Sequence, residues 1–163
     1  MLVLRALFFA LLMPGTVVIG IPWLLLRGQP SRDVRLDFPA VIGSALVIAG
    51  AATLFVCIRD FAVSGRGTLA PVDPPRKLVR VGLYRHVRNP MYLGVLLVLV
   101  GESLFFESPV LGFYAAIIAL AFHLFVVLFE EPSLRGLFGP DYERYRASVP
   151  RWVPRLRPWE GRH

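Results

Sequence analysis

Residues 90–132 constrain the fold of this chain more than any other part of it. A long apolar stretch begins after residues 88–90 (Arg-Asn-Pro), ends at 130–132 (Glu-Glu-Pro) and is interrupted once, at 107–109 (Glu-Ser-Pro). One helical crossing of a bilayer needs only about 20 residues, so this stretch is too long for a single crossing. It predicts two membrane-spanning helices joined by a tight turn. We expect the polar residues at both ends of this hairpin to meet at one membrane face.

The composition favours a membrane protein built from one domain. The chain has 163 residues, of which 56% are hydrophobic, and its mean hydropathy is +0.62, above the norm for soluble proteins. We therefore expect an all-α integral membrane fold, with residues 1–163 forming a single domain. Four crossings are expected, at about 5–26, 38–58, 91–106 and 109–129. The second of them, 38–58, is the richest in Gly and Ala. We expect it to lie centrally, because small residues let helices approach closely.

The basic residues predict the orientation of these helices. Fourteen of the 18 Lys and Arg residues lie in two segments, 59–90 and 131–163. Cytoplasmic loops are enriched in Lys and Arg, so both segments and both termini are expected in the cytoplasm of a multi-pass protein of a bacterial inner membrane. This clustering beside apolar segments argues against nucleic-acid binding, despite the net charge of +7. The alternation of Pro, Arg and Trp over 149–159 is suited to the lipid headgroup layer.

The charges at the hairpin ends indicate a ligand. Glu130 and Glu131 lie where a helix is expected to end, and the helix dipole there favours cations. Arg88 precedes a helix start, where anions are favoured; Asn89 is the expected N-cap and Pro90 the first helical residue. Each charge is badly placed for its own helix. Together they suit a ligand that turns a carboxylate toward Arg88 and a cation toward the two Glu.

The motifs themselves resemble those of a known enzyme group. Asn-Pro-Met-Tyr-x-Gly at 89–94, followed by Glu-Glu-Pro at 130–132, is similar to the integral-membrane methyltransferase superfamily. That group includes phosphatidylethanolamine N-methyltransferases and isoprenylcysteine carboxyl methyltransferases, and the resemblance covers about residues 60–155. Asn89 stands where the isoprenylcysteine branch has His, and Asn resembles the phospholipid branch. The resemblance implies S-adenosylmethionine as cofactor and a lipid or other hydrophobic small molecule as methyl acceptor.

The resemblance also implies roles for particular residues. The loop 60–90 and the tail 131–163 would cap a cofactor pocket, with no metal ion. His123 is a candidate for a reason independent of the resemblance, because ionisable groups inside a membrane are often functional. It lies seven residues before Glu130, is expected on the same helix face, and would either take a proton from the acceptor or hydrogen-bond a neighbouring helix. The other candidates for catalysis are Asn89 and Tyr92. The residues expected to contact the cofactor are Gly65, Gly67, Gly82, Tyr84, Arg88, Asn89, Pro90, Tyr92, Gly94, Glu130 and Glu131.

Other interpretations of the same residues stay open at this point. Arg88 and Glu130 would also make sense as a simple interfacial ion pair. A membrane reductase that uses a nicotinamide cofactor has a similar architecture, and a non-enzymatic membrane subunit would use the polar motifs as interface anchors. The sequence leaves open the acceptor atom (N, O or S), the general base and the oligomeric state.

The expected orientation can be measured directly. Topology reporters fused after His163 and inserted near Asp73 are both expected to report a cytoplasmic location, because both sites lie in the segments that hold the basic residues. Opposite locations for the two reporters would mean that residues 91–129 do not cross the membrane twice.

Overall fold

All regular structure in the described part of the chain is helical. The computed structural model describes residues 15–29, 37–64, 78 and 80–161; residues 1–14, and with them the first part of the expected crossing at 5–26, lie outside these ranges. The elements are η1 (Thr16–Gly20), α2 (Ile21–Arg27), α3 (Phe38–Ser64), η2 (Gly82–Arg85), α4 (Pro90–Phe105), α5 (Pro109–Phe125), η3 (Val126–Glu130), α6 (Glu131–Phe138) and α7 (Pro140–Ser148).

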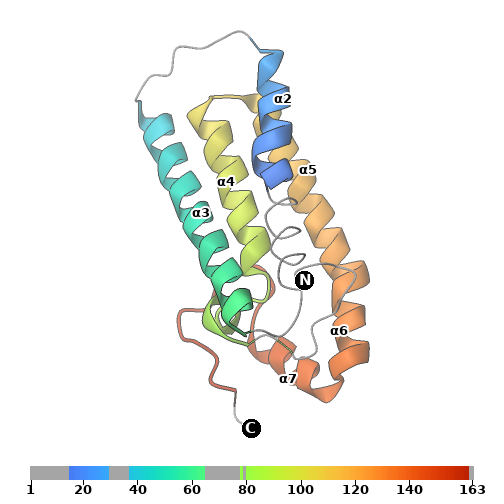
Figure 1. Ribbon diagram of the computed structural model, residues 1–163. Coiled ribbons are helices and arrows are strands. Elements are labelled where there is room, and N and C mark those ends of the chain that lie inside the picture. Colours follow the sequence, from blue (N-terminus) through green and yellow to red (C-terminus); the bar gives the residue numbers. More distant parts are fainter. Residues whose placement is uncertain (1–14, 30–36, 65–77, 79, 162–163) are drawn as a thin grey trace.

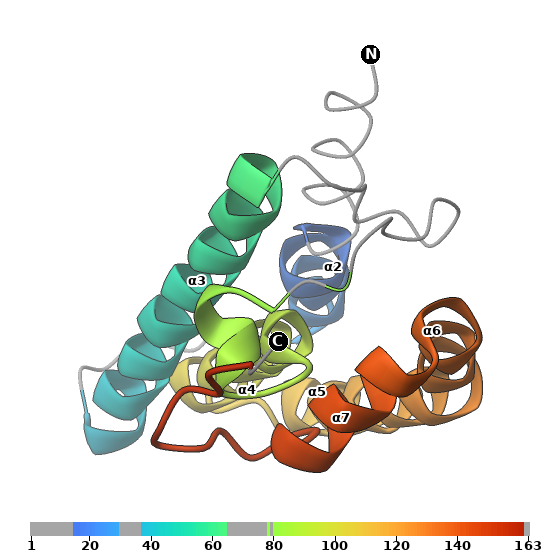
Figure 2. The same ribbon diagram turned by 90° about the horizontal axis from the view of Figure 1, so that it is seen from below.

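The longer helices form a bundle, and α4 lies at its centre. Figure 1 shows α4 between α3 and α5, with α2 beside α5. Seen from below, α6, α7 and the C-terminal segment gather under the ends of these helices (Figure 2). The expectation that the 38–58 segment is central is wrong. One face of α3 packs on α4, whereas Phe38, Ile48 and Phe55 on α3 are exposed.

The contact between α3 and α4 depends on two pairs of glycines. A Cβ atom added to Gly50 would lie 2.6 Å from the Gly94 carbonyl oxygen, and one added to Gly43 would lie 2.6 Å from the Gly101 carbonyl oxygen. The two backbones therefore touch at both levels, as small residues allow in membrane helices. The Gly and Ala content of α3 thus fixes one neighbour rather than a central position.

Among the described residues, two helices are long and apolar enough to cross a membrane: Phe38–Asp60 and the continuous helix Pro109–Phe138. Thr16–Arg27 and Pro90–Phe105 are apolar but shorter. The exposed faces of the long helices carry large apolar side chains, including Phe113 and Leu120 on α5. These features agree with a helical membrane protein, and the number of crossings stays a prediction.

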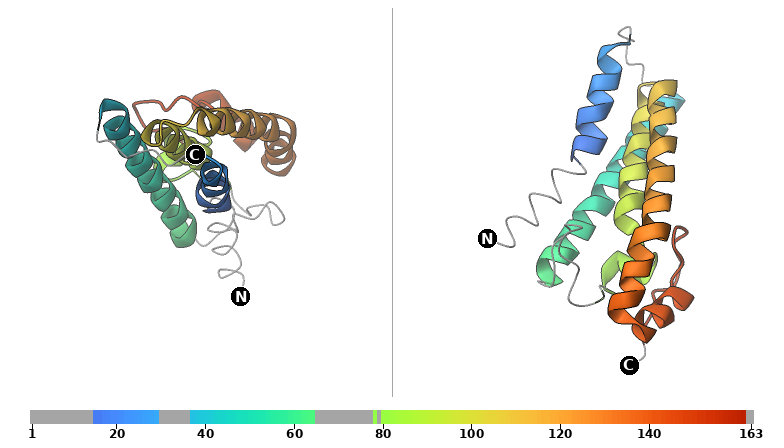
Figure 3. Two further views of the ribbon diagram at one scale, coloured as in Figure 1. Left: turned by 90° about the horizontal axis from the view of Figure 1, so that it is seen from above. Right: turned by 90° about the vertical axis from the view of Figure 1, so that its right-hand side faces the viewer.

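The helix that begins at Pro109 does not end before Glu130, as the sequence led us to expect. It continues through the π-helical turn η3 into α6, as the right-hand view of Figure 3 shows. Pro132 has no N–H to donate and its ring clashes with the preceding turn of an α-helix. The wider turn accommodates it, with the Glu131 N–H bonded to the Val126 carbonyl. The assignment of Glu130 and Glu131 to a helix C-terminus is therefore wrong.

A π-helical turn before a proline also occurs near the start of the described chain. Pro22 is also preceded by a π-helical turn, η1, in which the Ile21 N–H bonds to the Thr16 carbonyl. Each proline inside these helices thus follows a residue that bonds five positions back. Such turns bend a helix without breaking it.

The close contact of α3 and α4 at the pairs Gly50–Gly94 and Gly43–Gly101, here called the glycine seam, can be tested by substitution. Gly50→Ala is expected to lower the free energy of unfolding by about 1–3 kcal/mol, because the added methyl group meets backbone atoms of α4 that cannot move aside. Gly136→Ala on α6, where a Cβ meets nothing within 4 Å, is the matched control and is expected to be neutral or slightly stabilising. Denaturation in detergent measures both. Equal stabilities for the two variants would contradict the seam.

Candidate functional site

A cavity of about 80 Å³ lies at the end of the bundle where α4 begins. Its walls come from η2, the start of α4, the π-helical turn η3, α6 and α7. This arrangement confirms that the two ends of the 90–132 hairpin meet. The lining residues are Leu78, Tyr84, Arg88, Asn89, Val126, Glu130, Glu131, Leu134, Tyr142 and Tyr145.

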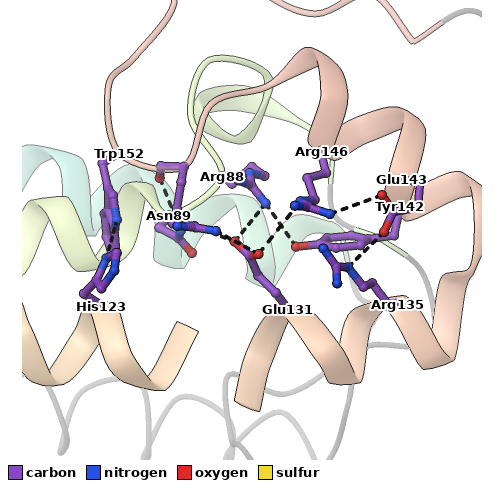
Figure 4. A network of polar contacts seen from close by, with 10 residues as sticks. Arg88, Asn89, His123, Glu131, Arg135, Tyr142, Glu143, Arg146 and Trp152 are labelled. Atoms are coloured by element: carbon purple, nitrogen blue, oxygen red, sulfur yellow. Dashed lines mark hydrogen bonds and ion pairs between the residues drawn. The ribbon is translucent and has the colours of Figure 1, made fainter. Parts of the chain in front are cut away.

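Glu131 is the centre of a buried network of arginines (Figure 4). Its carboxylate accepts hydrogen bonds from Arg88 Nη1 at 3.0 Å and from Arg151 Nε and Nη2 at 2.6 and 3.0 Å. Arg146 Nε lies 3.9 Å away. The Glu131 and Arg88 side chains are only 7% and 9% exposed, and the hydrogen bond to Glu131 raises the pKa of Arg151. Two-pronged pairing of this kind fixes geometry as well as charge.

Arg88 keeps one donor free. Its Nη1 also donates to the Tyr142 hydroxyl at 3.2 Å, and burial raises the pKa of Tyr142, which keeps that phenol protonated at neutral pH. By contrast, Arg88 Nε is buried and has no hydrogen-bond partner among the residues described. A buried donor left unpaired costs about 1–3 kcal/mol. This atom therefore has the capacity to bind an anionic group.

Glu130 has a different environment from its neighbour in sequence. Its Oε2 accepts a hydrogen bond from the Tyr92 hydroxyl at 3.1 Å. Within the described ranges Glu130 forms no ion pair, whereas the arginines converge on Glu131. The simple Arg88–Glu130 pair is therefore not what forms. Glu130 presents to the cavity a carboxyl group that has a hydrogen bond but no ion pair, and burial raises its pKa.

Asn89 occupies the expected position but does not act as a side-chain cap. Pro90 begins α4, and Asn89 is the residue before it, as predicted. The Asn89 side chain makes no capping bond; its Nδ2 donates instead to the Arg151 carbonyl at 3.2 Å. The expected cap is wrong because the amide is turned toward the C-terminal segment, which it ties to the start of α4.

His123 is not among the residues that line the cavity. It is exposed, and its Nδ1 accepts a hydrogen bond from Trp152 Nε1 at 3.2 Å. The π-helical turn adds a residue to the helix between His123 and Glu130, so Glu131 rather than Glu130 shares its face. Figure 4 shows both His123 and Glu131 directed toward the C-terminal segment. A catalytic role for His123 stays a prediction.

The glycines of the expected site are distributed differently. Gly65 and Gly67 lie outside the described residues. Gly82 begins η2 with φ of +54°, a conformation that favours glycine. Gly94 packs against α3 in the glycine seam. Of the η2 residues expected in the site, Tyr84 lines the cavity, and its carbonyl accepts a hydrogen bond from the Tyr145 hydroxyl at 2.7 Å.

Sequence reasoning missed the contribution of the C-terminal segment. Arg151 and Trp152 lie in the stretch that was interpreted as headgroup-facing, yet both contact the bundle. That interpretation fits Leu156, which is 97% exposed. The signal that could have identified Arg151 is charge balance, because Glu131 needs more than one cation if it is buried.

Comparison with known proteins assigns the family. Residues 38–141 match the family model for phospholipid methyltransferases, so the chain belongs to that family. It is 33% identical over 105 residues to methanethiol S-methyltransferase 2 of Bradyrhizobium diazoefficiens, which covers 63% of this chain and 34% of that protein. It is 33% identical over 78 residues to protein-S-isoprenylcysteine O-methyltransferase B of Arabidopsis thaliana, covering 48% of this chain and 40% of that protein.

A third relative is matched over a longer stretch. The chain is 29% identical over 123 residues to a probable protein-S-isoprenylcysteine O-methyltransferase of Oryza sativa subsp. indica, covering 72% of this chain and 62% of that protein. The chain thus spans from about a third to three fifths of the length of these relatives. No solved structure matches it.

The network predicts unequal effects for two acidic residues. Glu131→Gln is expected to lower the free energy of unfolding by about 3 kcal/mol, because it leaves buried guanidinium groups without a counter-charge. Glu143, which pairs with Arg135 and Arg146 but is half-exposed, is the matched control; Glu143→Gln is expected to cost at most about 1 kcal/mol. Denaturation in detergent measures the free energy of unfolding of both variants. A Glu131→Gln protein as stable as the parent would refute the structural role of Glu131.

Proposed function

We propose that this chain is an S-adenosylmethionine-dependent methyltransferase that acts on a lipid or other hydrophobic acceptor at a membrane. Its membership of the phospholipid methyltransferase family supports methyl transfer over the nicotinamide-dependent alternative. The observation that carries the proposal is the pairing of uncommitted groups in one cavity: Glu130 without an ion pair and Arg88 with a free Nε.

These two groups fit the methionine end of the cofactor, which carries a carboxylate, an ammonium and a sulfonium. Arg88 would hold the carboxylate and Glu130 would face the cationic groups. The cavity of about 80 Å³ is well below the roughly 300–1,000 Å³ of a complete small-molecule pocket. It has room for this end of the cofactor only. Tyr84, which lines the same cavity, would lie beside it.

The protein contributes to the reaction mainly by positioning the reactants. When bound, S-adenosylmethionine supplies a methyl group already activated by its sulfonium, so the protein has to orient the reactants and exclude water. Tyr92 holds the Glu130 carboxylate in place, while Tyr142 and Glu131 hold Arg88. The apolar part of the cavity wall that excludes water is formed by Leu78, Val126 and Leu134.

We further propose four membrane crossings with both termini in the cytoplasm, so that the cavity lies at the cytoplasmic end. Residues 60–90 and 131–163 would cap it, and the acceptor would arrive from the apolar phase of the membrane. By their names, the relatives transfer methyl groups to sulfur in one case and to oxygen in another. We therefore propose a hydrophobic acceptor class rather than a particular acceptor atom.

The proposal is tested by calorimetry on detergent-purified protein. We expect S-adenosylhomocysteine to bind with one site per chain, because it keeps the carboxylate and ammonium that Arg88 and Glu130 would hold. NADH and NADPH are the controls and are expected not to bind. Binding of a nicotinamide cofactor alone would favour the reductase, and no binding of any of these ligands would favour a non-enzymatic subunit.

The two adjacent glutamates are expected to separate binding from stability. Glu130→Gln should weaken S-adenosylhomocysteine binding by about 1–3 kcal/mol, the scale of a hydrogen bond to a charged group. It should leave stability nearly unchanged, because no ion pair is lost. Tyr92→Phe removes only the hydroxyl that orients Glu130 and should cause a smaller loss. Calorimetry with parallel melting curves measures these effects, and full affinity in Glu130→Gln would exclude Glu130 from the site.

A further inference from the structure

Three buried side-chain atoms have no hydrogen-bond partner among the residues described: Arg88 Nε, Asp60 Oδ2 and Glu102 Oε2. Buried polar groups are nearly always paired in folded proteins, so each unpaired atom needs an explanation. Glu102 lies in the last turn of α4, at the opposite end of the bundle from the cavity. Arg88 and Asp60 both lie at the cavity end, one offering a donor and the other an acceptor.

Asp60 is buried near the end of α3. Its side chain is 10% exposed, and its Oδ1 accepts a hydrogen bond from Arg59 at 3.0 Å. Its Oδ2 lies against Gly82, where an added Cβ would come within 2.0 Å of that oxygen. The absence of a side chain at Gly82 leaves the space for this carboxylate. One oxygen of Asp60 is therefore buried, fixed and still able to accept a hydrogen bond.

Asp60 is not itself a lining residue of the cavity, but it contacts the short helix η2, which contributes Tyr84 to the cavity wall. Asp60 packs against Gly82, the first residue of η2, and Arg88 follows three residues after its end. Between them in the sequence, Tyr84 lines the cavity. Four residues of 3₁₀-helix span about 8 Å. The free acceptor packs against the start of η2, and the free donor follows its end in the sequence.

We propose that Asp60 binds a ribose hydroxyl of S-adenosylmethionine, an inference that rests on the proposed function above. A carboxylate accepts hydrogen bonds only, so its partner must carry a donor, and carboxylates bind ribose hydroxyls in other nucleotide sites. In the cofactor the ribose lies several bonds from the methionine carboxylate, so separate residues have to bind the two groups; Asp60 and Arg88 are two such residues at the same end of the bundle. The cofactor would be held at two points, with its carboxylate on Arg88 and its ribose on Asp60.

The test compares S-adenosylhomocysteine with its 2′-deoxy and 3′-deoxy analogues by calorimetry. In the parent protein, one deoxy analogue should bind about tenfold to a hundredfold more weakly, the range expected for a hydrogen bond to a charged group. Asp60→Asn should weaken S-adenosylhomocysteine binding by a similar factor. In the Asp60→Asn variant, the same deoxy analogue should bind almost as well as S-adenosylhomocysteine does. The reason is that the substitution and the missing hydroxyl remove the same interaction.

Glu102→Gln is the matched control, since it neutralises the other buried carboxylate with an unpaired oxygen; its affinities should equal those of the parent. Asp60→Ser is the second variant if Asp60→Asn does not fold. The proposal would be overturned if, in an Asp60 variant, the deoxy analogue still bound more weakly than S-adenosylhomocysteine by the same factor as in the parent. So would a lower melting temperature with unchanged affinity, which would make Asp60 a structural cap of η2. If the parent binds no S-adenosylhomocysteine, the proposed function itself fails.

Discussion

The cavity end of this protein is organised around the carboxylate of Glu131. Arg88 from the start of α4 and Arg151 from the C-terminal segment both bond to it, and Arg146 from α7 lies within ion-pair distance. Arg88 and Arg151 are more than 60 residues apart in the sequence. Without a buried anion between them, their guanidinium groups would repel one another in a place with little water. Arg88 and Glu131 both line the cavity, so this arrangement forms part of its wall.

The two adjacent glutamates differ because of the proline that follows them. Pro132 is accommodated by a π-helical turn, and that turn directs Glu131 toward the arginines while Glu130 meets Tyr92. One carboxylate is neutralised and contributes to stability. The other has no ion-pair partner within the described residues, and burial raises its pKa; a cationic ligand beside it would favour its charged form. A Glu-Glu-Pro sequence therefore produces two distinct electrostatic environments from two identical side chains.

Unpaired atoms mark the parts of the site that the protein does not satisfy by itself. Arg88 has partners for Nη1 but none for its buried Nε, and Asp60 has a partner for Oδ1 but none for Oδ2. Both residues are otherwise firmly held, so the unpaired atoms are presented in fixed positions. A bound molecule with an anionic group and a hydroxyl would satisfy both. This is a form of preorganisation, in which the cost of ordering the side chains is met during folding.

The sequence alone was enough to predict a helical membrane protein, the meeting of the two hairpin ends and the start of α4 at Asn89 and Pro90. These features follow from hydropathy, helix length and local backbone preferences, which act over a few residues. The tertiary structure decided that α4 rather than α3 is central, that Asn89 bonds to the tail, and that Arg88 pairs with Glu131 instead of Glu130. Local preference cannot determine these outcomes, because each depends on which distant segment reaches a given side chain. The π-helical turn lies between the two cases: Pro132 made some irregularity necessary, but only the packed helix shows which glutamate it turns toward the arginines.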